Sequence, residues 1–175
     1  MDDRKNREGD TMAIRPILRF PHPDLNRVCD RVTTFDAELA ALAQDLADTM
    51  RAAPGVGITA AHIGVARRVV VIELEGQAAP RIFVNPEILD ASQETQEFNE
   101  GSVSMPGAIE KVTRPARIRL RWQSLDGQTG EEEMSGFLST CMQHEIDQLD
   151  GLFWLQRLSR LKRDRLIRKW EKAQR

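Results

Sequence analysis

The segment 143–148 carries residues whose types and spacing could do hydrolytic chemistry. In the helix motif His-Glu-x-x-His, the two histidines lie four residues apart on one face and bind one metal ion, while the glutamate activates a water molecule. Here His144 and Glu145 occupy the first two positions, but Gln148 stands where the second histidine belongs. The sequence therefore predicts a hydrolase-like site that lacks one metal ligand.

The residues around this segment have the spacing of a helix. Leu138, Met142, Glu145 and Leu149 recur at helical intervals, and Gly151 stands where a helix of this pattern would end. We expect one helix to present the whole motif.

An amphipathic helix of roughly four turns is predicted earlier in the chain. Thr34 or Asp36 can cap its start, and Pro54 and Gly55 end it. Its apolar positions follow the i, i+3, i+4, i+7, i+11 pattern and are Leu39, Leu42, Ala43, Leu46 and Met50.

Short β-rich runs lie between the two helices at residues 69–74, 82–84 and 117–123. In the last run apolar residues alternate with arginines, which predicts one buried and one exposed face. Asp126 and Gly127 form a hairpin-turn signal just after it. Because strands and helices are segregated along the chain, the order favours an α+β fold.

The composition indicates one globular domain. With 41% hydrophobic residues, a chain of 175 residues can build one sizeable core. Residues 1–11 are mostly polar or charged, so we expect a disordered leader before a single domain at 12–175. No segment approaches the roughly 20 apolar residues of a spanning helix, which predicts a soluble cytoplasmic protein without membrane contact. Cys29 and Cys141 indicate neither a disulfide framework nor a zinc knuckle.

Residues 157–175 form a basic tail on an acidic body. They carry nine basic side chains against Asp164 and Glu171, a local charge of +7 that leaves −9 for the rest of the chain. The apolar residues of the tail form an imperfect helical stripe of Leu158, Leu161, Ile167 and Trp170. We predict a C-terminal helix that docks on its own body and exposes its cations, which either attract phosphates or only improve solubility.

Three segments, 55–64, 100–107 and 143–151, resemble in order and spacing the three motifs of the peptide deformylase family, GxGxAAxQ, EGCLS and QHExDHxxG. The similarity extends from about Ala13 to the basic tail. It implies that family's fold, with antiparallel or mixed sheets around a central motif helix and a basic C-terminal helix. It also implies the family's activity, which removes the formyl group from an N-terminal methionine with iron or zinc held by one cysteine and two histidines.

Two of the three metal-ligand positions carry other residues. The resemblance places the cysteine at Ser102, the first histidine at His144 and the second at Gln148. A serine hydroxyl stays protonated near neutrality, and a glutamine offers a neutral oxygen better suited to calcium or magnesium. We therefore expect no cofactor, or only a weakly bound divalent metal. Without a metal the attacking water keeps a pKa near ~15.7 instead of ~7, so deformylation would be small or absent.

The other catalytic positions are partly kept. By resemblance, Glu145 is the general base, the backbone N–H of Val103 is one oxyanion donor, and His62 replaces the glutamine that supplies the other. His62 and His144, with Glu145 or Ser102, could instead form a rearranged metal site. Alternatively, His62 donates a hydrogen bond to a peptide carbonyl or packs into the cleft. A nucleophilic Ser102 or Ser104, with His62 or His144 as its base, is a weaker hypothesis, because no third, orienting group stands at recognisable spacing.

The resemblance also implies a peptide groove, in which the backbone of Gly55, Val56 and Gly57 would pair with a peptide as an added strand. The pocket for the methionine side chain would be lined by Val56, Phe98, Phe137, Thr140 and Cys141. For the two phenylalanines, ordinary core packing explains the residue type equally well. Glu100 and Arg114 are expected to form an ion pair that positions the ligand loop.

We expect a peptide-deformylase-like protein that binds N-termini starting with methionine or formylmethionine, with metal-dependent deformylation lost or severely weakened. The enzymatic alternative is an active deformylase that uses a rearranged metal site through His62. A third hypothesis is a non-catalytic interaction protein that associates with the ribosome through its basic helix. Whether the chain is an enzyme, what its natural ligand is and how it oligomerises do not follow from the sequence.

Overall fold

The computed structural model describes residues 13–175, so the leader predicted at 1–11 lies outside the described residues. The α-helices are α1 (Ala37–Ala52), α2 (Gly136–Leu149) and α3 (Arg160–Ala173), and the 3-10 turns are η1 (Pro23–Asn26), η2 (Ala60–Ile63) and η3 (Trp154–Arg157). The strands are β1 (Gly57–Thr59), β2 (Val69–Ile72), β3 (Arg81–Ala91), β4 (Thr95–Ser102), β5 (Met105–Pro115), β6 (Arg117–Gln123) and β7 (Thr129–Ser135).

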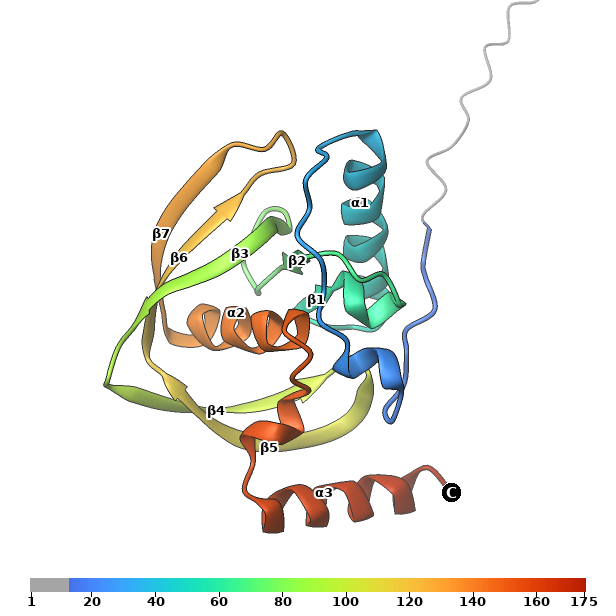
Figure 1. Cartoon of the computed structure of the whole chain (residues 1–175). Coiled ribbons are helices and arrows are strands. Elements are labelled where there is room, and N and C mark those ends of the chain that lie inside the picture. Colours follow the sequence, from blue (N-terminus) through green and yellow to red (C-terminus); the bar gives the residue numbers. More distant parts are fainter. Residues whose placement is uncertain (1–12) are drawn as a thin grey trace, which may run out of the picture.

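The elements form an α+β fold, as predicted from their order. Five antiparallel strands make one sheet in the order β1-β2-β3-β6-β7, and β4 and β5 pair in a second sheet. Figure 1 shows α2 in the middle of the molecule, where it contacts strands of both sheets, while α1 packs beside β1 and β2. The motif helix is therefore central, with strands of both sheets packed around it.

Two hydrophobic clusters cover the opposite faces of the larger sheet. In β2, Val70 and Ile72 pack in the cluster that holds Met142 and Ile146 of α2. The alternate residues of β2 pack in the cluster that holds the apolar face of α1. Successive side chains of a strand point to opposite faces, so four buried residues in a row can serve two helices at once.

Helix α1 agrees with its prediction from the sequence. Asp36 is the N-cap, and its side chain accepts a hydrogen bond from the Leu39 backbone N–H at 3.0 Å. All the apolar positions predicted for its inner face are buried.

The strand predictions are confirmed in part. β6 coincides with the run predicted at 117–123, and its apolar residues face inward while its arginines are exposed. β3 extends well beyond the predicted 82–84, because a shift of register around Asn85 and Pro86 lets its pairing with β6 continue to Ala91. The Asn85 side chain stabilises this point by accepting from the Val32 N–H and donating to the Val32 carbonyl, both at 2.8 Å.

Helix α2 is almost entirely enclosed by the rest of the protein. Every residue from Ser139 to Leu149 is buried, including the polar ones. The helix ends before Gly151, whose φ of +79° is in the left-handed region and whose Cβ position lies 2.6 Å from the Asn26 carbonyl oxygen. The predicted stop is therefore enforced both by conformation and by close packing.

Helix α3 forms within the predicted basic segment but begins at Arg160, because residues 154–157 form η3 instead. Leu166 and Trp170 are buried, and the indole N–H of Trp170 donates to the Pro106 carbonyl at 2.8 Å. The predicted apolar stripe was wrong at Leu161, which is 74% exposed, and Leu166 packs in its place. Among residues 13–175 no helix is long and apolar enough to cross a membrane.

Candidate functional site

A cavity of about 330 Å³ opens between β1, the turn that joins β4 to β5, and α2. Its volume is at the lower end of ordinary small-ligand sites. Backbone and side chains of Gly55, Val56 and Gly57 line one wall, and Ser102 and Val103 line another. Helix α2 and the turn η2 supply the remaining predicted residues, which are His62, Phe137, Thr140, Cys141, His144 and Glu145.

Two predicted site residues do not line the cavity. Phe98 packs against Phe137 in a tilted arrangement, with ring centroids 5.4 Å apart, so it supports a residue of the cavity wall without lining the cavity itself. Gln148 is 2% exposed, and its Nε2 donates to the Leu25 carbonyl at 2.7 Å. The residue at the second histidine position is thus hydrogen-bonded to the backbone of η1.

The strand that borders the cavity has a free edge within its sheet. β1 pairs only with β2 among the described strands, and lies at the end of the five-stranded order. An extended peptide could therefore add to β1 as a further strand, as predicted for the backbone around Gly55 and Gly57.

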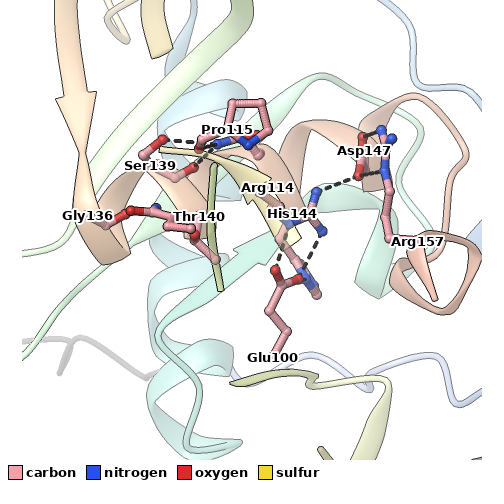
Figure 2. A network of polar contacts seen from close by, with 11 residues as sticks. Glu100, Arg114, Pro115, Gly136, Ser139, Thr140, His144, Asp147 and Arg157 are labelled. Atoms are coloured by element: carbon pink, nitrogen blue, oxygen red, sulfur yellow. Dashed lines mark hydrogen bonds and ion pairs between the residues drawn. The ribbon is translucent and has the colours of Figure 1, made fainter. Parts of the chain in front are cut away.

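His144 is held in one orientation by a buried ion pair. Its Nδ1 lies 2.8 Å from Oε1 of Glu100, and the Glu100 carboxylate also accepts from Nε and Nη2 of Arg114 at 2.6 and 2.9 Å (Figure 2). The predicted Glu100–Arg114 ion pair is thereby confirmed. Because a carboxylate that is bonded to a guanidinium can only accept, Nδ1 of His144 carries the proton of this contact, and its Nε2 is left to face other partners.

The pKa values of this pair follow from burial and hydrogen bonding acting in opposite directions. Burial acts to raise the pKa of Glu100, but hydrogen bonds from His144 and Arg114 outweigh it and hold the pKa below its ordinary value. Burial acts to lower the pKa of His144, but the hydrogen bond to Glu100 and the nearby carboxylates outweigh it and raise that pKa. Each partner favours the charged form of the other.

The ion pair belongs to a longer network that the sequence did not reveal. Nη1 of Arg114 also donates to Asp147 at 2.9 Å, and Asp147 accepts two more hydrogen bonds from Arg157, at 2.8 and 2.7 Å (Figure 2). Arg157 is one of the nine basic side chains of the tail, and this contact ties it to the body of the protein. A signal existed in the position of Asp147, three residues after His144, which places both on neighbouring faces of one helix.

Glu145 faces the cavity from a buried position. It is 5% exposed, and among residues 13–175 its Oε2 has no hydrogen-bond partner. Burial raises the pKa of Glu145 to about 7. Its Oε1 lies 2.7 Å from where a Cβ of residue 57 would be, so Gly57 is the residue that makes room for this carboxyl group against β1.

His62 is fixed by a local hydrogen bond that also sets its tautomer. Its Nδ1 accepts from the Thr59 backbone N–H at 2.9 Å and lies 3.1 Å from the Thr59 hydroxyl. A backbone N–H can only donate, so Nδ1 is unprotonated and Nε2 carries the hydrogen of the neutral ring. Burial, followed by the charge of His144, lowers the pKa of His62 to about 3, which keeps the ring neutral. Within the described chain this Nε2 is buried without a partner.

The donor set at the three ligand positions does not fit a tightly held iron or zinc ion. The Ser102 hydroxyl accepts from the Ser104 N–H at 3.1 Å, and Gln148 is bonded to Leu25. Burial raises the pKa of the nearby Cys141 thiol to about 12, far from the thiolate that binds metals. In the part of the chain that the structure describes, no three His, Cys, Asp or Glu side chains are grouped so that they could hold a metal.

The rearranged site through His62 meets a further obstacle. A metal at Nε2 would need a lone pair there while Nδ1 accepts from Thr59, and a neutral imidazole has only one unprotonated nitrogen. The serine hypothesis also lacks its geometry, because no hydrogen bond joins Ser102 to a histidine anywhere in residues 13–175.

Comparisons with known proteins point to one family. A family model described as polypeptide deformylase matches residues 14–164. A peptide deformylase-like protein of Brucella melitensis is 58% identical over 164 residues, covering 94% of this chain and all of the relative. A peptide deformylase of Afipia carboxidovorans is 44% identical over 165 residues, with 93% of this chain and 96% of the relative covered.

Solved structures give the same result for the fold. A peptide deformylase of Legionella pneumophila is 38% identical, covers 93% of this chain and 96% of its own, and superposes with a TM-score of 0.87. A peptide deformylase of Ehrlichia chaffeensis in complex with actinonin is 34% identical, covers 94% and 99%, and gives a TM-score of 0.85.

Proposed function

The chain belongs to the peptide deformylase family, and we propose that within it this protein binds peptide N-termini that start with methionine or formylmethionine, with metal-dependent deformylation lost or severely weakened. The proposal separates two parts of the site. The groove that receives a peptide is kept, and the ligands that would hold a catalytic metal are replaced.

The observation that carries the proposal is the hydrogen bond from Gln148 to the Leu25 carbonyl. It engages the side chain at the second histidine position in a buried contact outside the cavity, so this residue serves packing and not a ligand shell. The first replaced position, Ser102, offers a neutral hydroxyl that already accepts a hydrogen bond. His144 alone keeps both a ligand's residue type and the carboxylate partner that usually orients a metal-binding histidine.

The shape of the cavity supports the binding part of the proposal. β1 offers an open edge for an extended backbone, and the cavity beside it is lined by Phe137, Thr140 and Cys141. Val56 and Ile109 are exposed at its rim, at 43% and 63%. An apolar recess next to a free strand edge suits a peptide whose first side chain is long and apolar.

The polar groups of the cavity are arranged to bind and orient such a peptide. His62 presents Nε2–H as a donor to a carbonyl, and by resemblance the Val103 backbone N–H is the second donor to the same oxygen. Glu145 presents a carboxyl oxygen as an acceptor. In the family a bound metal supplies an activated water, but the side chains of this protein hold, orient and hydrogen-bond a ligand without one.

Formate release and peptide binding, measured on the same preparation, test the proposal. We expect formyl-Met-Ala-Ser to bind in calorimetry while formate release stays at background, with less than stoichiometric iron, zinc or nickel by elemental analysis. Stoichiometric metal with ordinary turnover would overturn it and favour the rearranged site. His62→Gln then decides that rival, since metal uptake through His62 requires this ring and the proposal requires no change in metal content.

The basic helix supports a location for this binding activity. Outward-facing cations of α3 could hold the protein in the cytoplasm on ribosomal RNA, where new N-termini emerge. The exposed cations that support this are Arg160, Lys162, Arg165, Arg168, Lys169 and Lys172.

A further inference from the structure

We infer that a second cavity, beside the C-terminal helix, binds the base of an unpaired nucleotide in RNA. Such a site makes RNA binding selective for single strands, which attraction between the cations of α3 and phosphates does not. The choice of RNA rests on the proposed location at the ribosome. The second cavity shares no lining residue with the peptide groove, so its test is independent of peptide binding.

The second cavity is formed by η1 and the loop before it, and has a volume of about 330 Å³. Its apolar lining consists of Phe20, Leu25 and Phe153 with two prolines, Pro21 and Pro23. A proline ring is rigid and fixes the local backbone, while Leu25 and Phe153 are held in the protein at 1% and 4% exposure. The recess is therefore formed before a ligand enters, which lowers the cost of binding.

Two contacts place the second cavity directly beside α3. The ring of Phe20 stacks on Phe153 with centroids 5.3 Å apart and meets Trp170 of α3 edge-on at 6.0 Å. The preceding residue, Arg19, donates from Nη2 to Oε1 of Gln174, the C-cap of α3, at 2.8 Å. A polymer that lies along the C-terminal part of α3 can therefore reach the cavity.

Cations outnumber carboxylates at this end of the described molecule. Arg19, Lys169 and Lys172 are exposed here, against an exposed Glu171 and the half-buried Asp24 of η1. The chain as a whole has a net charge of −2, so this local excess of positive charge is a feature of one surface. Cations beside an aromatic recess suit a polyanion that also carries flat rings, which is the chemistry of single-stranded nucleic acid.

Two polar side chains of the second cavity can bond to the edge of a base. Nδ1 of His22 accepts from the Asp24 backbone N–H at 3.1 Å, so the neutral ring carries its hydrogen on Nε2 and can donate it. Asn26 is exposed and lines the same cavity, and its amide offers a donor and an acceptor. The edges of a base are free in an unpaired nucleotide and are used for pairing in a duplex.

Charge alone predicts the opposite preference. A duplex carries two strands of phosphates where a single strand carries one, so cations by themselves favour the duplex. Contact between an unpaired base and aromatic side chains strengthens binding by about tenfold, and a base within a duplex cannot make it. A preference for the single strand would therefore come from the cavity and not from the cations.

Fluorescence anisotropy with the unmodified protein tests the inference. The probes are a short labelled single-stranded RNA without self-complementarity and the duplex of the same strand, at one salt concentration. We expect the single strand to bind about tenfold more tightly than the duplex. Equal or tighter binding of the duplex would overturn the inference, and so would a failure of both RNAs to bind. The proposed peptide binding is measured separately by calorimetry and stands or falls on that result.

Two variants locate the preference in the second cavity. Phe20→Leu keeps an apolar contact for Trp170 but removes the ring, and we expect it to weaken single-strand binding about tenfold while duplex binding is unchanged. An equal loss with both RNAs would assign the effect to the docking of α3, and a full preference in a folded Phe20→Leu protein would exclude the cavity. Either result overturns the inference.

Asn26→Ala decides the matter if Phe20→Leu fails to fold, because Asn26 is exposed and its side chain can be removed without opening the core. We expect it to weaken single-strand binding severalfold and to leave duplex binding unchanged. Gln93→Ala removes an exposed amide from the loop between β3 and β4 and serves as the matched control. An Asn26→Ala protein with the same ratio of affinities as the control would overturn the assignment to this cavity.

Discussion

At His62 a single backbone hydrogen bond restricts what the imidazole can do. The Thr59 N–H occupies Nδ1, so the ring can donate through Nε2 but has no lone pair for a metal. The sequence left this residue with several roles, as a metal ligand, an oxyanion donor or a packing residue. The choice among these roles depends on the hydrogen bond from the Thr59 backbone N–H, which the residue types at 59 and 62 do not predict.

Restoring the two replaced ligands should recreate metal binding at the residue scale. In Ser102→Cys with Gln148→His, we expect metal-free protein to lose about 1–3 kcal/mol of stability, because the Leu25 carbonyl loses its buried donor. Zinc should then raise the melting temperature, since a ligand that binds only the folded state stabilises it by mass action. Thermal unfolding with and without zinc, together with elemental analysis, measures both effects.

Ser104→Cys with Gln148→His is the matched control, because it adds the same two side-chain types with the thiol two residues from the ligand position. A zinc response in the control equal to that of the restored pair would show that the effect does not depend on the family geometry. Formate release in the restored pair alone would show that the rest of the site had been kept.

The buried carboxyl group of Glu145 should make stability depend on pH. Its pKa is about 7 in the folded protein and near 4.5 when exposed, so between these values the folded state binds more protons than the unfolded state. Its contribution is fully present below pH 4.5, falls as pH rises toward about 7, and then levels off. The loss amounts to at most about 3 kcal/mol.

Urea unfolding of the wild-type protein and Glu145→Gln from pH 4.5 to 7.5 isolates this contribution. We expect the difference between the two free energies of unfolding to move in favour of the variant as pH rises. A difference that stays constant across this range would mean that Glu145 is ionised throughout in the folded protein.

At the scale of elements, the close approach of β1 and α2 depends on one glycine. In Gly57→Ala the new methyl group must displace the Glu145 carboxyl group, which we expect to cost about 1–3 kcal/mol of stability and to weaken peptide binding. The same substitution in a Glu145→Ala background should cost less, because the obstructing side chain is gone. Chemical denaturation of the four proteins in a double-mutant cycle measures the coupling, and additive costs would contradict the proposed contact.

A second link between elements is the carboxylate of Asp147, which joins Arg114 of β5 to Arg157 of η3. Asp147→Ala should destabilise by about 2–3 kcal/mol, because Arg114 is 3% exposed and its Nη1 would lose its acceptor where water cannot replace it, although Glu100 still balances the charge. Arg157→Ala should cost about 1 kcal/mol, since that side chain is 48% exposed and Arg114 keeps Asp147. Equal costs for the two variants, measured by urea unfolding, would contradict this reading of the network.

The elements that could be predicted from the sequence are those whose pattern reflects burial on one face. α1 and β6 are of this kind, because their apolar residues recur at 3.6 and 2.0 positions. β7 could not be predicted because it carries Glu131, Glu132 and Glu133. Glutamate is unfavourable in strands, and these residues are stabilised here by pairing across to β6.

The residues of the site divide in the same way into those that the sequence predicts and those that it does not. The cavity-lining residues followed from motif resemblance, while the bonds of Gln148 and Asp147 come from tertiary contacts.

At the scale of the whole molecule, the uneven charge of the chain is also uneven in space. α3 packs on the body through Leu166 and Trp170 and lies at one end of the molecule, with most of its cations exposed (Figure 1). Removing this helix would uncover those two side chains, so a loss of ribosome binding after deletion would have two explanations. Substitution of its cations separates charge from packing.

We expect Arg165→Gln, Arg168→Gln and Lys169→Gln together to weaken ribosome co-sedimentation without lowering the melting temperature. Each phosphate contact contributes about 0.7–0.9 to the slope of log affinity against log salt, so three lost contacts should reduce that slope by roughly 2 to 3. Arg27→Gln, Arg31→Gln and Arg119→Gln remove the same charge from exposed positions on the body and serve as the control. An equal loss in both triple variants would assign the attraction to net charge, and an unchanged slope in the α3 variant would remove the helix from ribosome binding altogether.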